Sequence, residues 1–105
     1  MFQEMMPMSS GISSSKVMAD VTGTPTTGFT DCEIGKDYIL SFTIQSRNVT
    51  DFTSYVTGLT VTEKLSESNI ASSSAVYAVR GTATATTVKT ASAVSNTSLV
   101  RIYLS

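Results

Sequence analysis

The stretch DYILSFTIQS, residues 37–46, constrains the fold of this chain more than any other segment. Large apolar side chains occupy every second position, at Tyr38, Leu40, Phe42 and Ile44, and the positions between them are mostly hydroxyl or amide residues. Successive side chains of a strand point to opposite faces, so this pattern predicts a strand with one face on a core and the other facing out.

Further runs with the same period predict more strands. They are residues 16–23 (KVMADVTG), 54–65 (SYVTGLTVTEKL), 75–89 (AVYAVRGTATATTVK) and 97–105 (TSLVRIYLS). Segments rich in Gly, Ser, Asn or Pro predict turns at residues 22–28, 46–48, 66–74 and 92–98. No window has apolar residues sustained at helical spacing, and residues 63–73 could form a turn or two of helix at most.

The fold class predicted is all-β. Links this short cannot carry parallel crossovers, so we expect six to eight mainly antiparallel strands. Strands of this length separated by such loops are typical of a small antiparallel β-sandwich, immunoglobulin-like or jelly-roll-like. One core is expected to hold the following residues: Leu40, Phe42, Ile44, Leu59, Val61, Ile102 and Leu104.

Two local features refine this expectation. Gly58, inside a strand run, indicates a bulge or a close backbone approach. The run TATATT, residues 82–87, has almost no side-chain volume, which favours an edge strand covered in an assembly. The alternative is a central strand whose Ala residues lie under bulky neighbours such as Phe42.

Composition excludes several classes of function. The 105 residues leave room for one domain, and 14% charged residues with a net charge of -1 lack the clustered Lys and Arg of an electrostatic nucleic-acid binder. There is no His, which excludes a Ser-His-Asp triad, a Cys-His dyad and a His-bearing zinc site. Cys32 is the only Cys, so no internal disulfide or CxxC motif can form. We therefore expect a non-enzymatic protein with no cofactor.

The first 15 residues, MFQEMMPMSSGISSS, differ from the rest of the chain. Four of the five Met residues fall within eight positions, followed by a Ser/Gly spacer typical of a flexible linker. Met adapts to irregular partner surfaces, so Phe2, Met5, Met6 and Met8 are the expected partner-binding residues. A frayed terminus is the alternative. The expected division is an anchoring arm and linker at residues 1–15 and a β-sandwich domain at residues 16–105.

This opening segment lacks a basic region followed by a continuous apolar run, as a signal peptide would have. No run approaches the ~18 apolar residues of a membrane-spanning helix. We therefore expect synthesis in the cytoplasm without a signal peptide and no insertion into a membrane.

A carboxylate cluster at Asp31, Glu33 and Asp37 raises the question of calcium. The spacing departs from an EF-hand loop, in which Gly follows the third ligand and a bidentate Glu closes the site. We expect no metal site, and interpret these residues as solvated charges before a strand. Cys32 between them is expected to be a small, semi-buried apolar residue.

Tyrosine and arginine side chains could form a recognition surface, because aromatic faces stack on sugar rings and Arg binds polar groups in a fork. Tyr55, Tyr77 and Arg80 are the candidate glycan-binding residues, with Tyr103, Arg47 and Arg101 as further members. The alternative places each Tyr half in the core with its hydroxyl in water.

The order of segments resembles small virion proteins of phages and prophages of Gram-positive bacteria. A Met-rich start, a Ser/Gly spacer, CEIGKDYILSFTI, a VTGLTV hairpin and a closing RIYLS strand follow one another. A GKxYxL strand recurs in tail-associated and fibre-like β-sandwich domains of that group, here Gly35, Lys36, Tyr38 and Leu40. The chain has no long coiled coil or repeat, which departs from a complete tail fibre.

The resemblance implies a non-enzymatic virion structural protein, a tail-associated or capsid-decorating subunit located in the virion. It would dock through its N-terminal arm onto other virion proteins and copies of itself, and would be made in the cytoplasm of the host. The alternative is a small carbohydrate-binding or adhesion module that contacts a bacterial surface glycan. No nucleic-acid partner is expected.

Overall fold

The structure, a computed structural model, describes residues 12–20, 28–91 and 94–104. These residues form seven strands and no helix, and every strand pairing is antiparallel. The expected all-β class, strand number and antiparallel arrangement are therefore confirmed for this part of the chain. The arm residues Phe2, Met5, Met6 and Met8 lie outside the described residues.

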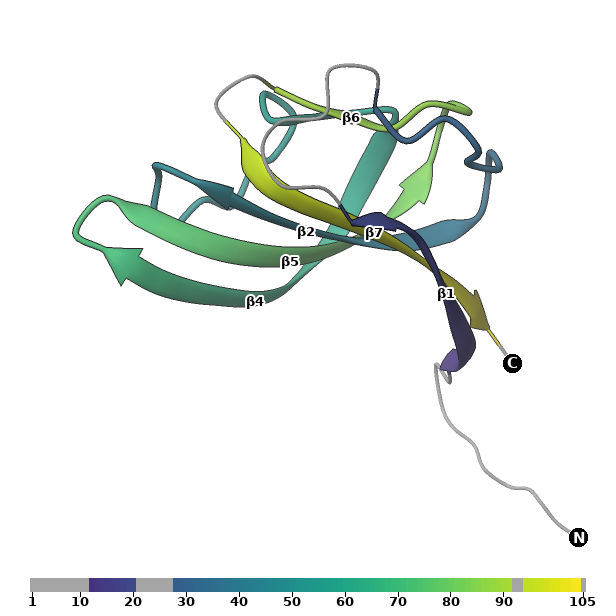
Figure 1. The fold of residues 1–105 in the computed structure, drawn as a ribbon, viewed down its shortest axis with the longest axis horizontal. Helices are drawn as coiled ribbons and strands as arrows, with labels where there is room; N and C mark the ends of the chain where they lie inside the picture. The colour runs from purple at the N-terminus through teal and green to yellow at the C-terminus, as the bar shows by residue number, and fades with distance from the viewer. Residues whose placement is uncertain (1–11, 21–27, 92–93, 105) are drawn as a thin grey trace, which may run out of the picture.

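Five strands form one sheet in the order β1-β7-β2-β5-β4, and two short strands form a second sheet, β3-β6 (Figure 1). The bounds are β1 (Ile12–Asp20), β2 (Asp37–Ile44), β3 (Val56–Thr57), β4 (Leu59–Ala71), β5 (Ser74–Ala83), β6 (Lys89–Thr90) and β7 (Ser95–Leu104). β1 and β4 are the two edge strands. β1 begins at Ile12, so the expected boundary between residues 15 and 16 falls inside a strand.

The core lies on the inner face of the five-stranded sheet. The alternation predicted for β2 is confirmed, because Tyr38, Leu40, Phe42 and Ile44 are all buried. Leu40 pairs with Val79 of β5 and with Leu99 of β7, so side chains of three adjacent strands share this face.

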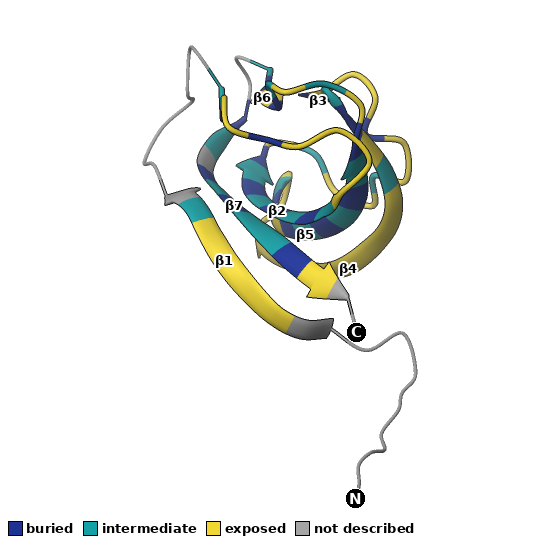
Figure 2. Ribbon diagram, turned by 90° about the vertical axis from the view of Figure 1, so that its right-hand side faces the viewer, coloured by how far each residue is buried: buried dark blue, intermediate teal, exposed yellow. Residues whose placement is uncertain are grey.

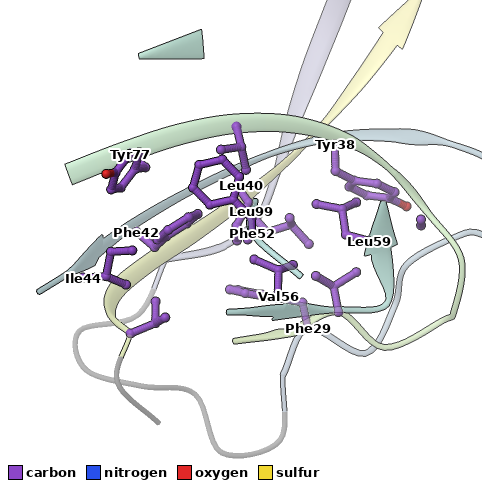
Figure 3. Close-up of a cluster of buried hydrophobic side chains, with 14 of the residues drawn as sticks. Phe29, Tyr38, Leu40, Phe42, Ile44, Phe52, Val56, Leu59, Tyr77 and Leu99 are labelled. Carbon is purple, nitrogen blue, oxygen red and sulfur yellow. The ribbon is translucent and has the colours of Figure 1, made fainter. Parts of the chain in front are cut away.

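The five-stranded sheet is curved, and the β3-β6 pair and the loops beside it cover its inner face (Figure 2). The cover contributes Phe29, Phe52, Val56, Val88 and Val94 to the core. Figure 3 shows the rings of Phe42, Phe52 and Tyr77 together at one end of this cluster. The Phe42 centroid lies 5.8 Å from that of Phe52 and 5.7 Å from that of Tyr77.

The predicted core is correct in part. Leu40, Phe42, Ile44 and Leu59 belong to it, and Val61 packs against it. For β7 the predicted face is wrong. The Leu40–Leu99 pairing turns Leu99 to the core, so Ile102, although buried, lies outside the core cluster. The side chain of Leu104 is outside the described set.

The turn predicted at residues 66–74, and the helical turn considered at residues 63–73, are wrong. β4 continues as a strand to Ala71, and only Ser72 and Ser73 form the turn into β5. Backbone pairing with β5 holds this polar segment extended, from Glu63 opposite Arg80 to Ala71 opposite Ser74. The turn predicted at residues 92–98 also extends too far, since β7 begins at Ser95.

The TATATT run is not an edge strand. β5 ends at Ala83 and lies between β2 and β4, and residues 84–86 form a bend. The close approach predicted at Gly58 is confirmed: its φ is +83°, and a Cβ there would clash with the carbonyl oxygen of Thr87.

Candidate functional site

The outer face of the five-stranded sheet is the opposite face to the core. Strand register places on it Ile39, Ser41 and Thr43 of β2 and their partners on β5 and β7, namely Val76, Ala78, Arg80, Ser98 and Val100. All of these side chains retain some exposure, and most are short. In Figure 1 the covering segments of the described chain lie on the other side of the sheet. The outer face is thus the broad accessible surface of the described chain.

One charged pair crosses this outer face. The Arg80 guanidinium donates to Asp37 over 2.9 Å, and the Thr82 hydroxyl donates to the other oxygen of the same carboxylate over 2.8 Å. These two side chains come from adjacent strands, since Asp37 pairs with Thr82 in the ladder. The hydrogen bond from Arg80 holds the pKa of Asp37 below its usual value. The pair ties the start of β2 to the end of β5.

A second charged pair lies where the 31–36 turn meets β7. Arg101 and Glu33 are 3.1 Å apart, and the backbone N–H of Glu33 donates to the Tyr38 hydroxyl over 2.7 Å. A shallow hollow of about 300 Å³ lies beside them. It is lined by Gly35, Lys36, Asp37, Arg101, Ile102 and Tyr103. Both acids near it are already paired with arginines, so the arrangement fixes the turn on the sheet.

The three acids considered for calcium have different surroundings. Glu33 pairs with Arg101, Asp37 pairs with Arg80, and Asp31 is exposed. Within residues 12–20, 28–91 and 94–104, no group of three or more His, Cys, Asp or Glu is placed to hold a metal ion. Cys32 is buried rather than semi-buried, its thiol donates to the Phe29 carbonyl over 3.4 Å, and burial raises its pKa.

The three candidate glycan-binding residues do not form one surface. Tyr77 is fully buried on the inner face, between Phe42 and Phe52, so its ring cannot stack on a sugar. Arg80 lies three positions along β5 on the outer face and is engaged by Asp37. Tyr55 is half-buried and packs against the core. The period of two in β5 separates Tyr77 from Arg80, because odd and even positions face opposite ways.

Tyr77 has a structural role. Its hydroxyl donates to the Ser46 carbonyl over 3.1 Å and accepts the Val49 N–H over 3.0 Å. These bonds fasten the loop at residues 46–52 to the β4–β5 hairpin.

A clamp on the same loop comes from β4. The Asn48 N–H donates to the Glu67 carboxylate over 2.7 Å, and Lys64 reaches both Glu67 at 2.8 Å and the Val49 carbonyl at 3.3 Å. The hydrogen bond from Lys64 is the main cause that lowers the pKa of Glu67. Sequence patterning does not reveal this clamp, because Asn48 and Val49 are distant from Lys64 and Glu67 in the chain and the pattern predicts a turn at residues 66–74.

The hairpin that β4 and β5 form carries exposed apolar side chains. We call them the hairpin patch: Leu65, Ile70 and Val76, which are 43%, 59% and 36% exposed. A hollow of about 480 Å³ lies beside Ile70. It is lined by Thr43, Ile44, Gln45, Ile70, Ser74 and Ser95. Sequence patterning missed this patch, because Ile70 lies between Ser, Asn and Ala with no alternation.

No helix in the described residues is long and apolar enough to cross a membrane. Comparison with protein-family models, with curated proteins and with solved structures finds no significant match to this chain.

Proposed function

We propose that this chain is a non-enzymatic structural subunit that associates with copies of itself and with other proteins of a larger assembly, anchored through its N-terminal arm. The assembly we propose is the virion of a phage, in keeping with the segment order of the sequence. In that setting the chain is a tail-associated or capsid-decorating subunit.

The observation that carries this proposal is the contrast between the two faces of the sheet. The inner face is filled by its own cover, while the outer face carries short side chains and meets the exposed apolar hairpin patch. Exposed apolar clusters rimmed by polar residues are a common mark of protein–protein contact. The two edge strands, β1 and β4, add further backbone groups available for pairing.

We also propose that the fold is a small β-sandwich in which the β3-β6 pair and the adjoining loops form the second layer. Its support is the core shared by Leu40 and Phe42 of the sheet with Phe52 and Val88 of the cover. The division into five strands and two differs from the four and three strands of constant-type immunoglobulin domains.

The proposal is tested by the state of association in solution. The full chain should sediment as an oligomer or as a concentration-dependent mixture. A full-length variant with Met5→Ser, Met6→Ser and Met8→Ser should sediment as a folded monomer, because the apolar groups of the anchor are gone. The matched control, Gln3→Ser with Ser9→Ala and Ser10→Ala, changes the same segment without removing apolar groups and should associate as the wild type does. A wild-type protein that stays monomeric at high concentration, or an unchanged Met variant, would refute the proposal.

A further inference from the structure

We infer that the acceptor for the N-terminal arm is the hairpin patch of a second copy of this chain. This inference rests on the proposed anchoring function and adds the partner and the surface. The arm supplies Phe2, Met5, Met6 and Met8, and the patch supplies Ile70 and Val76 with the hollow beside them.

The shape and chemistry of the patch suit flexible apolar side chains. Ile70 is the most exposed apolar residue of the hairpin, and the hollow next to it is lined by Ile44 and Ile70 together with four uncharged polar residues. An unbranched Met side chain fills irregular gaps of this kind without a fixed shape of its own. Val76, opposite Thr43 on the outer face, extends the apolar surface along β5.

Charge favours the same match. Between residues 65 and 79 the only charged side chain is Glu67, whose carboxylate is already bound by Lys64 and by the Asn48 N–H. The Arg47 guanidinium donates to the Ser72 carbonyl at the hairpin turn over 3.2 Å. Among residues 1–11 the only charged side chain is Glu4. Apolar contact between the two segments therefore removes few charges from water, which keeps the desolvation cost low.

Distance excludes the patch of the same copy as the acceptor for the methionines. Ile12 lies opposite Leu104, which is three residues past the β7 position that pairs with Tyr38. The patch lies beside the other end of β2, near Ile44, which is six residues from Tyr38. Nine residues at ~3.3 Å make about 30 Å along the strands, and four strand spacings add about 19 Å across the sheet.

The methionines lie too close to Ile12 to span that path. Met5 is seven residues before Ile12, and an extended chain spans at most ~3.6 Å per residue, so Met5 reaches about 25 Å and Met8 about 14 Å. In Figure 1 the start of β1 and the tip of the β4–β5 hairpin lie at opposite ends of the molecule. The methionines that fill the patch therefore belong to the arm of another copy.

This arrangement makes each copy both a donor and an acceptor at different places. Such head-to-tail contacts close into a ring or continue as a filament, depending on the rotation between copies. The two functions can then be removed separately in two variants of the full chain.

The experiment mixes a donor-only protein with an acceptor-only protein. Ile70→Ser with Val76→Ser removes the acceptor and keeps the arm. Phe2→Ser with Met5→Ser, Met6→Ser and Met8→Ser removes the donor and keeps the patch. Each variant alone should sediment as a monomer, and an equimolar mixture should form a complex of twice the monomer mass. Circular dichroism and thermal unfolding check that each variant is folded. If the Ile70/Val76 double variant fails to fold, Ile70→Gln alone replaces it and should weaken association at least tenfold.

The control is Ile34→Ser, at an equally exposed apolar residue of the 31–36 turn, 60% exposed against 59% for Ile70. It should assemble as the wild type does. If the arm variant is monomeric but the Ile70/Val76 variant assembles normally, the acceptor is elsewhere and the anchoring function stands. If the arm variant assembles normally, the anchoring function itself is refuted. A mixture that stays monomeric, or an Ile34→Ser protein that fails to assemble, overturns the inference.

Discussion

The two faces of the five-stranded sheet are made from the same strands but differ in what they carry. On the inner face β2 presents Tyr38, Leu40 and Phe42, and all three are fully buried. On the outer face the same strand presents Ser41 and Thr43, which remain partly exposed. Large side chains on the inner face bury the apolar surface that stabilises the fold. Residues on the outer face are therefore less constrained by stability and can serve contacts with other proteins.

The same contrast applies to polar groups. On the inner side, the Tyr77 hydroxyl and the Lys64–Glu67 pair fasten a loop of the cover. On the outer side, the Asp37–Arg80 pair joins neighbouring strands and fixes no cover. Polar groups on the inner side therefore hold the cover over the core, whereas those on the outer side join strands that the sheet already pairs.

The largest effect is expected from Phe42→Ala. This side chain is fully buried and contacts two aromatic rings, so its loss should lower the free energy of unfolding by about 3–5 kcal/mol. The neighbouring Thr43→Ala, on the outer face, should change it by less than about 0.5 kcal/mol. Urea titration of both variants measures the difference, and equal losses would mean that the two faces are not distinct.

Two glycines give the next comparison. Gly58 and Gly35 both have positive φ, but a Cβ at Gly58 would meet the Thr87 carbonyl of the cover, while one at Gly35 meets nothing within 4 Å. Gly58→Ala should destabilise the protein by about 2–4 kcal/mol, from backbone strain and overpacking. Gly35→Ala should cost only the backbone strain, about 1–2 kcal/mol. Thermal unfolding compares the two, and a Gly35 variant as unstable as the Gly58 variant would contradict the close approach.

Tyr77→Phe keeps the ring and removes the hydroxyl that fastens the cover. The Val49 N–H and the Ser46 carbonyl lose a partner, so we expect a loss of about 1–3 kcal/mol. In the variant, amide hydrogen exchange at residues 46–52 should be faster than in the wild type, while exchange in β2 should change less. Unchanged exchange in this loop would mean that the hydroxyl does not hold it.

The smallest effect is expected from Asp37→Asn. Because Arg80 lowers the pKa of Asp37 in the folded state, this carboxylate stabilises the fold above its unfolded pKa of about 3.9, and that stabilisation is lost as the pH falls through the folded pKa. The pair is partly exposed, so the variant should lose less than about 1 kcal/mol at pH 7. The difference from wild type should shrink below pH 4 in urea titrations. A difference that stays constant down to pH 2 would show that the charge of Asp37 is not its cause.

Sequence patterning predicted the inner face correctly for β2, the strand in which large apolar residues alternate most clearly with polar ones. The alternation in β2 identified Tyr38, Leu40, Phe42 and Ile44, and the all-β class followed from similar runs. In β7 the set Val100, Ile102 and Leu104 is the more apolar of the two, yet the pairing with β2 turns Leu99 to the core. Pairing across strands is a long-range property that one strand does not encode.

The candidate contact surface could be predicted less well. β4 is polar and exposed along most of its length from Glu63 to Ala71, and the whole strand has three irregularities in its register against β5. Such a strand is held by backbone hydrogen bonds, which leave no apolar period in the sequence. For the same reason the position of Ile70 beside the hollow could not be predicted, because it depends on the pairing of β4 with β5.

Radical footprinting of exposed side chains tests whether copies of the chain meet at the hairpin patch. Labelling is compared between the assembled wild type and the folded variant with Ser at positions 2, 5, 6 and 8. We expect Ile70 and Val76 to be labelled less in the wild type, and Ile34 to be labelled equally in both proteins. Equal labelling of Ile70 and Val76 in the assembled and monomeric proteins would contradict it.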